Sequence, residues 1–277
     1  MSLKGLAAET ISIVDRGHYK APSGRIVSIE PGVRAMLDGT FLYDPTALTE
    51  LVAGLGPVAD PHITQIQVTG ETTGAALRRL VVDEGRGPVF ALNFASAKNP
   101  GGGFVGGAKA QEEDLCRVSA LYPSQLTKRA YYDENRSCGT MLYTDHAIYS
   151  PGVVFFRDER LELLEAPFEA SILTMPAPNA GEHARHGRGG VRAVREALER
   201  RIAMVLAVAR TRGYRSLVLG AWGCGVFRND PAQVAALFDQ ALESAAFKGA
   251  FERVVFAVYD RKEGPNRRAF EERFTGR

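Results

Sequence analysis

Apolar and polar positions alternate along the chain with two periods, one typical of helices and one of strands. Near the N-terminus one helical face is apolar, and Gly17 is placed to end that helix. The apolar positions are Leu3, Leu6, Ile13 and Val14. Strands are predicted at residues 62–68, 87–95, 153–156, 169–175, 216–221 and 253–260, and further helices at 72–84, from about 112, at 191–211 and at 231–245. This alternation predicts an α/β fold, with a mixed or mostly parallel sheet covered by helices on both faces.

The chain shows no internal repeat, no low-complexity segment and no shift in composition that would mark a boundary between domains. A length of 277 residues suits one large α/β domain. We therefore expect a single domain over residues 1–277, of which about residues 1–60 form an N-terminal helical extension.

Composition and charge narrow the classes of function. With 45% hydrophobic and 24% charged residues the chain is typical of a globular protein. Its 34 basic and 32 acidic residues give a net charge of +2, too small for binding DNA or a membrane surface by bulk electrostatics. A polyanionic ligand would have to be held locally. We expect a monomer that binds neither DNA nor membrane.

Three cysteines, Cys116, Cys138 and Cys224, are odd in number and widely spaced, which favours a reducing compartment over a disulfide framework. No apolar run approaches the length of a membrane span, and the first 15 residues do not have the pattern of an export signal. A cytoplasmic location is therefore predicted.

A glycine-rich segment follows the strand predicted at residues 87–95. Its glycines are Gly101, Gly102, Gly103, Gly106 and Gly107. Glycine permits positive φ and lets the backbone approach a phosphate or ribose closely. Because the segment lacks both the dinucleotide fingerprint and the Lys-Ser/Thr of a P-loop, we interpret it as a ligand loop of another kind.

Gln111, Glu112 and Glu113 open the helix that comes next. Acidic residues at a helix start commonly do no more than balance the helix dipole. Because this helix follows a ligand loop, a catalytic role for the two glutamates is the alternative. Neighbouring carboxylates point about 100° apart on a helix, so one can face a scissile bond while the other holds sugar hydroxyls. Glycoside hydrolysis requires a carboxylic acid to protonate the leaving oxygen.

A second glycine-rich segment, residues 219–231, follows the strand predicted at 216–221. Loops at the carboxyl ends of parallel strands converge on one cleft, the usual ligand site of an open α/β sheet. Backbone N–H groups in this segment can form an anion nest, which predicts a diphosphate ligand. They belong to Gly223, Cys224, Gly225, Val226 and Phe227. The Phe227 ring either faces a sugar or base, or packs in the core.

Two other groups of residues allow competing interpretations. Glu182, His183 and His186 have the residue types of a metal site, but the surrounding glycines and the lack of further ligands favour a polar surface loop. Cys224 is either a nucleophile or a small buried residue beside the anion nest, and the second is favoured because its motif holds no histidine. Trp222 is expected to pack beneath the loop.

Four motifs together carry a family resemblance: GGGFVGGAKAQEE at residues 101–113, ET-x-x-I-x-x-x-G-x-Y at 9–19, VTGETTGAA at 68–76 and GAWGCGVF at 220–227. On these motifs the chain resembles the short bacterial-type branch of the poly(ADP-ribose) glycohydrolases, over about 220 of its 277 residues. The resemblance implies a macrodomain-like fold, a mixed sheet flanked by helices that binds ADP-ribose.

The resemblance also implies roles for residues. Glu113 matches the catalytic acid/base, which would protonate the departing 2′-oxygen and then deprotonate water. Glu112 matches the partner that contacts ribose hydroxyls. Glu71 stands where related proteins hold the adenine amino group, with helix capping by Thr72 or by the carboxylate itself as the alternative. The glycines of both loops and Gln111 are expected to line the substrate site, and no metal or other cofactor is implied.

One further position has two candidates, because either Asn93 or Asn99 matches a ribose contact. The expected reaction is hydrolysis of poly(ADP-ribose), mainly from its terminus, with ADP-ribose as the product. The substrates would be the polymer and ADP-ribosylated proteins. A non-catalytic ADP-ribose reader, a mono(ADP-ribosyl) hydrolase and a structural protein without a ligand are the alternatives. The glutamate pair favours an enzyme.

Overall fold

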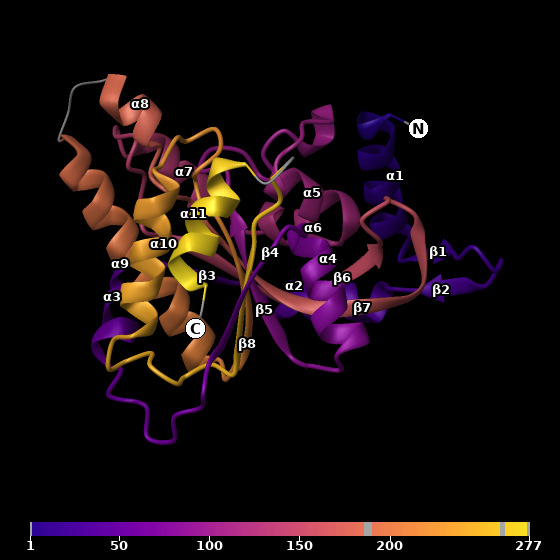
Figure 1. Ribbon diagram of the computed structural model, residues 1–277. Helices are drawn as coiled ribbons and strands as arrows, with labels where there is room; N and C mark the ends of the chain where they lie inside the picture. The colour runs from indigo at the N-terminus through magenta and orange to yellow at the C-terminus, as the bar shows by residue number, and fades with distance from the viewer. Residues whose placement is uncertain (1, 186–189, 261–263, 276–277) are drawn as a thin grey trace.

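A computed structural model describes residues 2–185, 190–260 and 264–275, and in them a seven-stranded sheet lies between two helical layers (Figure 1). From edge to edge the strands are β3 (Phe41–Tyr43), β6 (Ala147–Arg157), β7 (Leu163–Met175), β5 (Val89–Phe94), β8 (Ser216–Leu219), β9 (Arg253–Ala257) and β4 (Gln65–Thr69). The pairs β3–β6 and β6–β7 are antiparallel, and every other neighbouring pair is parallel. The predicted α/β class with a mixed sheet is confirmed.

Both faces of the sheet are buried, which explains why the central strand is apolar throughout. In β5 the side chains of Val89 and Ala91 enter one core cluster, and those of Phe90 and Leu92 enter the other. One face is covered by α1 (Leu3–Arg16), α2 (Glu30–Gly39), α4 (Thr73–Arg78) with the π-helix η1 (Arg79–Asp83), α5 (Gln111–Val118) and α6 (Leu121–Leu126). The other is covered by α3 (Pro45–Ala53), α9 (Gly190–Thr211), α10 (Pro231–Leu242) and α11 (Pro265–Phe274).

The N-terminal segment is only partly helical. Helix α1 ends as predicted, because Gly17 has a φ of 71° and donates its N–H to the carbonyls of Ile13 and Val14. Helices α2 and α3 follow, but the segment also forms the hairpin of β1 (His18–Lys20) and β2 (Ile26–Ser28) and the edge strand β3. The prediction of a helical extension was therefore incomplete, because strands of three residues are too short to show a period of two.

Other elements were missed or predicted too short. The strands predicted at 153–156 and 169–175 are parts of β6 and β7, and α6, α7 (Arg129–Ser137), α8 (Ala180–Arg185) and α11 were not predicted. The expected surface loop at Glu182 and His183 is instead helix α8, in which His183 is buried, while His186 lies outside the described residues. Over the described part of the chain, no helix is long and apolar enough to cross a membrane.

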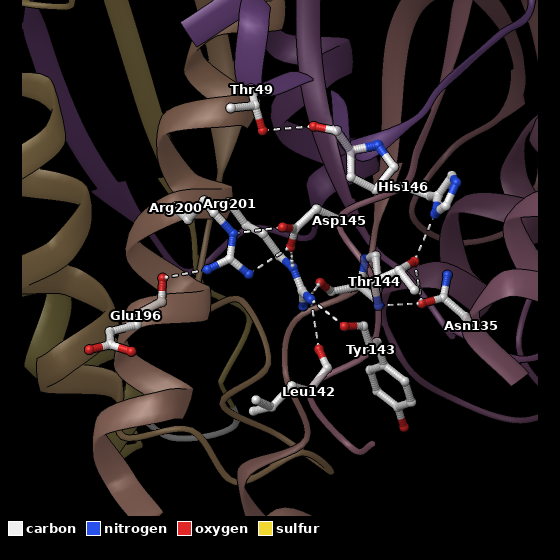
Figure 2. A network of polar contacts seen from close by, with 12 residues as sticks. Thr49, Asn135, Leu142, Tyr143, Thr144, Asp145, His146, Glu196, Arg200 and Arg201 are labelled. Carbon is white, nitrogen blue, oxygen red and sulfur yellow. Dashed lines mark hydrogen bonds and ion pairs between the residues drawn. The ribbon is translucent and has the colours of Figure 1, made fainter. Parts of the chain in front are cut away.

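A buried arginine of α9 fixes the segment that leads into β6 (Figure 2). The guanidinium of Arg201 is fully buried and donates to Asp145 Oδ1 at 2.6 Å, and Arg200 donates to Oδ2 of the same carboxylate. Arg201 also donates to the carbonyls of Leu142, Tyr143 and Pro176. Burial acts to raise the pKa of Asp145, but the two guanidiniums outweigh it and hold the pKa below its usual value.

We predict that Asp145→Ala lowers the free energy of unfolding by about 3–5 kcal/mol, because it leaves the Arg201 charge buried without its partner. Denaturant unfolding measures this, with Glu196→Ala as the control, since the exposed Arg192–Glu196 pair should contribute at most about 1 kcal/mol. As the folded-state pKa of Asp145 is depressed, its contribution is lost as the pH falls through that pKa. Similar small losses in both variants would contradict the prediction.

Candidate active site

The two glycine-rich loops open at the same edge of the sheet. They follow β5 and β8, which are neighbouring parallel strands. Helix α5 begins directly after the first loop, and α10 begins after the second (Figure 1). The convergence predicted from the sequence is therefore present in the structure, at the position where open α/β sheets bind ligands.

The first loop lies directly on the glutamate pair. Gly101 and Gly102 have φ values of 65° and 57°. A Cβ atom on Gly102 would lie 2.5 Å from Glu113 Oε1 and 3.1 Å from Glu112 Oε2. Only glycine allows the backbone this approach, so the loop and the carboxylates form one unit.

Helix α1 supports the far end of this loop. The short helix η2 (Phe104–Gly106) ends at Gly107, which has a φ of 83°. A Cβ atom there would lie 2.9 Å from the backbone nitrogen of Lys4 in α1. Gly106 has no such close neighbour, since its Cβ position is open within 4 Å. The close packing of α1 therefore explains the glycine at position 107.

Glu112 points into the protein, where every polar partner is a donor. Its Oε1 accepts from Asn93 Nδ2 at 3.0 Å and from Gln125 Nε2 at 2.8 Å, and its Oε2 accepts from the Ser96 N–H at 2.6 Å. The residue is only 2% exposed. Burial raises the pKa of Glu112 to about 8, although the three donors act to lower it. The site therefore holds this carboxyl in a fixed orientation.

Glu113 points the other way, as the helical spacing predicts. It is 9% exposed, and its Oε1 accepts from the Gly103 N–H at 2.8 Å. Among the described residues nothing hydrogen-bonds to its Oε2. One carboxylate oxygen is thus anchored to the loop, and the other is available to a substrate.

The remaining polar residues near the pair divide into supports and exposed groups. Asn93 is fully buried and also donates to Thr174 Oγ1, whereas the Asn99 side chain is exposed and has no partner within the described chain. Gln111 joins α5 to β5, because its amide accepts from the Phe94 N–H and donates to the Leu92 carbonyl. Its amide is thus already engaged within the protein. The geometry favours Asn99 over Asn93 as a ligand contact.

Gln125 and Ser96 are contacts of Glu112 that the sequence did not indicate. Gln125 comes from α6, thirteen residues after Glu112, and no motif marks it. The Cys116 thiol donates to Gln125 Oε1 at 3.6 Å. This contact turns the amide NH2 of Gln125 towards Glu112. Burial raises the pKa of Cys116, so the thiol keeps its proton.

The second loop presents most of the predicted N–H groups. Within the described residues, the N–H groups of Gly223, Gly225, Val226 and Phe227 have no protein acceptor. That of Cys224 is engaged, because it donates to the Ala221 carbonyl at 3.1 Å, so its inclusion in the nest was wrong. Four donors are therefore left for an anion.

Side chains beneath and beside this loop fix its shape. Trp222 is fully buried, as predicted. Asn229 donates to the carbonyls of Pro178 and Gly223 and so ties the loop to the segment after β7. Burial raises the pKa of Cys224 to about 12, which keeps the thiol protonated and disfavours a nucleophile. The half-buried Phe227 ring lies 6.0 Å from the ring of Tyr143, in the segment that Arg201 anchors.

Glu71 follows β4 at the same edge of the sheet. Its two oxygens accept from Arg79 Nε and Nη2, both at 2.9 Å, and Thr72 caps α4 through its hydroxyl. Burial acts to raise the pKa of Glu71, but the hydrogen bonds from Arg79 outweigh it and lower the pKa. The neighbouring Tyr259, 64% exposed after β9, was not predicted, because a single aromatic residue after a strand gives no distinctive signal.

Comparison with known proteins identifies this arrangement. The sequence profile of the family described as microbial-type PARG, catalytic domain, matches residues 7–158, more than half of the chain. PARG denotes poly(ADP-ribose) glycohydrolase. No curated protein matches the chain.

Solved structures match over nearly the whole length. The crystal structure of poly(ADP-ribose) glycohydrolase from Thermomonospora curvata is 49% identical, covers 98% of this chain and 99% of its own, and has a TM-score of 0.93. The same protein bound to the inhibitor ADP-HPD is 48% identical with the same coverage and a TM-score of 0.89. The glycohydrolase from Deinococcus radiodurans in complex with ADP-ribose is 48% identical, covers 88% of this chain and 96% of its own, and has a TM-score of 0.81.

These matches confirm the macrodomain-like fold. In this chain the two glycine-rich loops follow the neighbouring strands β5 and β8, and the glutamate pair comes directly after the first loop. The chain belongs to the microbial-type poly(ADP-ribose) glycohydrolase family.

Proposed function

We propose that this chain hydrolyses the ribose–ribose O-glycosidic bonds of poly(ADP-ribose), mainly from the terminus, and releases ADP-ribose. The observation that carries the proposal is the glutamate pair. One carboxylate is immobilised by three donors, and the other has one oxygen on the loop and one oxygen available. Membership of the glycohydrolase family supports the same reaction.

In the proposed mechanism, Glu113 is the general acid and base. Its Oε2 carries a proton to the departing 2′-oxygen as the glycosidic bond breaks and an oxocarbenium-like ribose develops. The same carboxylate then takes a proton from water, which attacks the ribose carbon. The hydrogen bond from the Gly103 N–H to Oε1 keeps the carboxylate in place through both transfers.

Glu112 is proposed to accept hydrogen bonds from the ribose hydroxyls. Its buried donors leave the carboxylate no rotational freedom, so the ribose would be oriented without further ordering. Asn99, exposed on the first loop, is the proposed second ribose contact.

The rest of ADP-ribose would lie along the second loop and the ends of β4 and β9. The N–H groups of Gly223, Gly225, Val226 and Phe227 are the proposed donors to the diphosphate. Adenine would lie near Glu71 and the exposed Tyr259 ring, which lie at the same edge because the Val258 N–H donates to the Thr69 carbonyl at 2.9 Å.

Two alternatives remain distinct from this proposal. A reader would bind ADP-ribose without turnover, and a mono(ADP-ribosyl) hydrolase would release it from a protein linkage. The buried support around Glu112 favours turnover, because binding alone does not require an immobilised pair. We also propose a cytoplasmic monomer, a location that the three free cysteines support.

We predict that Glu113→Gln lowers the release of ADP-ribose from labelled polymer by about 10³-fold or more, because the amide cannot transfer a proton. ADP-ribose affinity, measured by calorimetry, should stay within about tenfold, or about 1.4 kcal/mol. Asp114→Asn is the matched control, since Asp114 is the next residue of α5 but its half-exposed carboxylate pairs with the buried Arg117. Wild-type protein that binds ADP-ribose but releases none from polymer would support a reader instead, and release from a mono(ADP-ribosyl)ated protein alone would support the second alternative.

We predict that Gln125→Leu moves the pH dependence of kcat/KM upwards. If the anion of Glu112 accepts the ribose hydroxyls, wild-type kcat/KM rises as the pH passes about 8. Removal of one donor to the carboxylate should move that rise by about one to two pH units. Ser124→Ala is the control, because Ser124 is equally buried in α6 but bonds to Ser150. An unchanged profile for Gln125→Leu would show that this amide does not set the ionisation of Glu112.

A further inference from the structure

Lysines gather around the first glycine loop without acidic partners. Four of the seven lysines of the chain, Lys4, Lys98, Lys109 and Lys128, form what we call the lysine rim. The first three are exposed and Lys128 is half-buried. In the described part of the chain no carboxylate pairs with any of the four, whereas the distant Lys248 pairs with Glu243 at 3.1 Å.

Two members of the lysine rim are placed by the residues that hold Glu112. The Lys98 N–H donates to the hydroxyl of Ser96, the residue whose own N–H binds Glu112. The Lys128 N–H donates at 3.2 Å to the carbonyl of Gln125, the residue whose amide binds the same carboxylate. Each of these two lysines is therefore hydrogen-bonded through its backbone to a residue that itself hydrogen-bonds to Glu112.

The other two members are placed by the loop itself. Lys109 follows Ala108, whose Cβ lies 2.7 Å from the Cβ position of Gly103, and Gly103 anchors Glu113. The backbone nitrogen of Lys4 lies 2.9 Å from the Cβ position of Gly107. The lysine rim therefore borders the loop that covers the glutamate pair.

Acidic residues are few in the segment that carries three of the four rim lysines. Across residues 94–132 the only acidic residues are Glu112, Glu113 and Asp114. The first two are buried beneath the loop, and the third is paired with Arg117 at 2.8 Å. A local excess of positive charge remains on a chain with a net charge of only +2.

The lysine rim and the proposed diphosphate donors belong to different loops. Those donors are in the loop after β8, whereas the rim borders the loop after β5 and reaches α1 and α6, which cover one face of the sheet (Figure 1). A polymer that continues beyond the scissile bond carries another diphosphate, which needs positive charge where it leaves the site.

Building on the proposed function, we propose that the lysine rim binds the diphosphate of the ADP-ribose unit beyond the scissile bond, and thereby favours polymer over single ADP-ribose groups. The lysines act as mobile, hydrated charges, which suits a poly(ADP-ribose) polymer that must move after each cleavage. Their contribution is electrostatic and is weakened by salt.

The test is the double variant Lys98→Gln/Lys109→Gln, assayed with labelled polymer and with free ADP-ribose. We expect KM for polymer to rise by about three- to tenfold and to depend less on salt concentration than in the wild type. The affinity for free ADP-ribose should not change, because one unit does not reach the rim. Lys98→Arg/Lys109→Arg should retain the wild-type KM, and Lys248→Gln is the remote control.

Two results would overturn this assignment. An unchanged KM and salt dependence would show that the lysine rim does not contact the polymer, and an equal loss of ADP-ribose affinity would show that the lysines act on the main pocket. Failure of the proposed function is distinguishable from failure of this assignment, because the wild type itself would then release no ADP-ribose from polymer.

Discussion

The burial of the Glu112 carboxylate is the constraint on which the site depends. A carboxylate removed from water must be matched by donors, and here Asn93 comes from β5, Ser96 from the chain just after it, and Gln125 from α6. Each donor requires its element to keep its position. The Glu112 carboxylate thus joins the sheet, the first loop and α6, and these contacts set the shape of the cleft.

The second requirement is close backbone approach. Gly102 lets the loop lie on both glutamates, and Gly107 lets α1 lie on the loop. A helix near the start of the chain therefore supports residues about a hundred positions later. The Thr10 hydroxyl of the N-terminal motif also donates to the Arg117 carbonyl at 2.8 Å, so this motif contacts α5, the helix that carries both glutamates.

Local chemistry was predictable from the sequence, and contacts between distant segments were not. The period of apolar residues indicated the main strands, Gly17 indicated the end of α1, and the glycine loops with Glu112 and Glu113 indicated the site. Gln125 and Arg201 could not be predicted, because their roles depend on residues that only the fold brings close. The Cys224 N–H failed as a nest donor because a local turn to Ala221 uses it, a detail of backbone geometry that composition does not encode.

The contact between α1 and Gly107 has a practical consequence. Leu3 and Lys4 lie against the loop that anchors Glu113, and the Ser2 hydroxyl accepts the Gly5 N–H as the cap of the helix. Residues added at the N-terminus, such as an affinity tag and its linker, would therefore be attached within a few residues of the first glycine loop. A tag placed after α11 would instead begin on the opposite face of the sheet from α1 and the first loop.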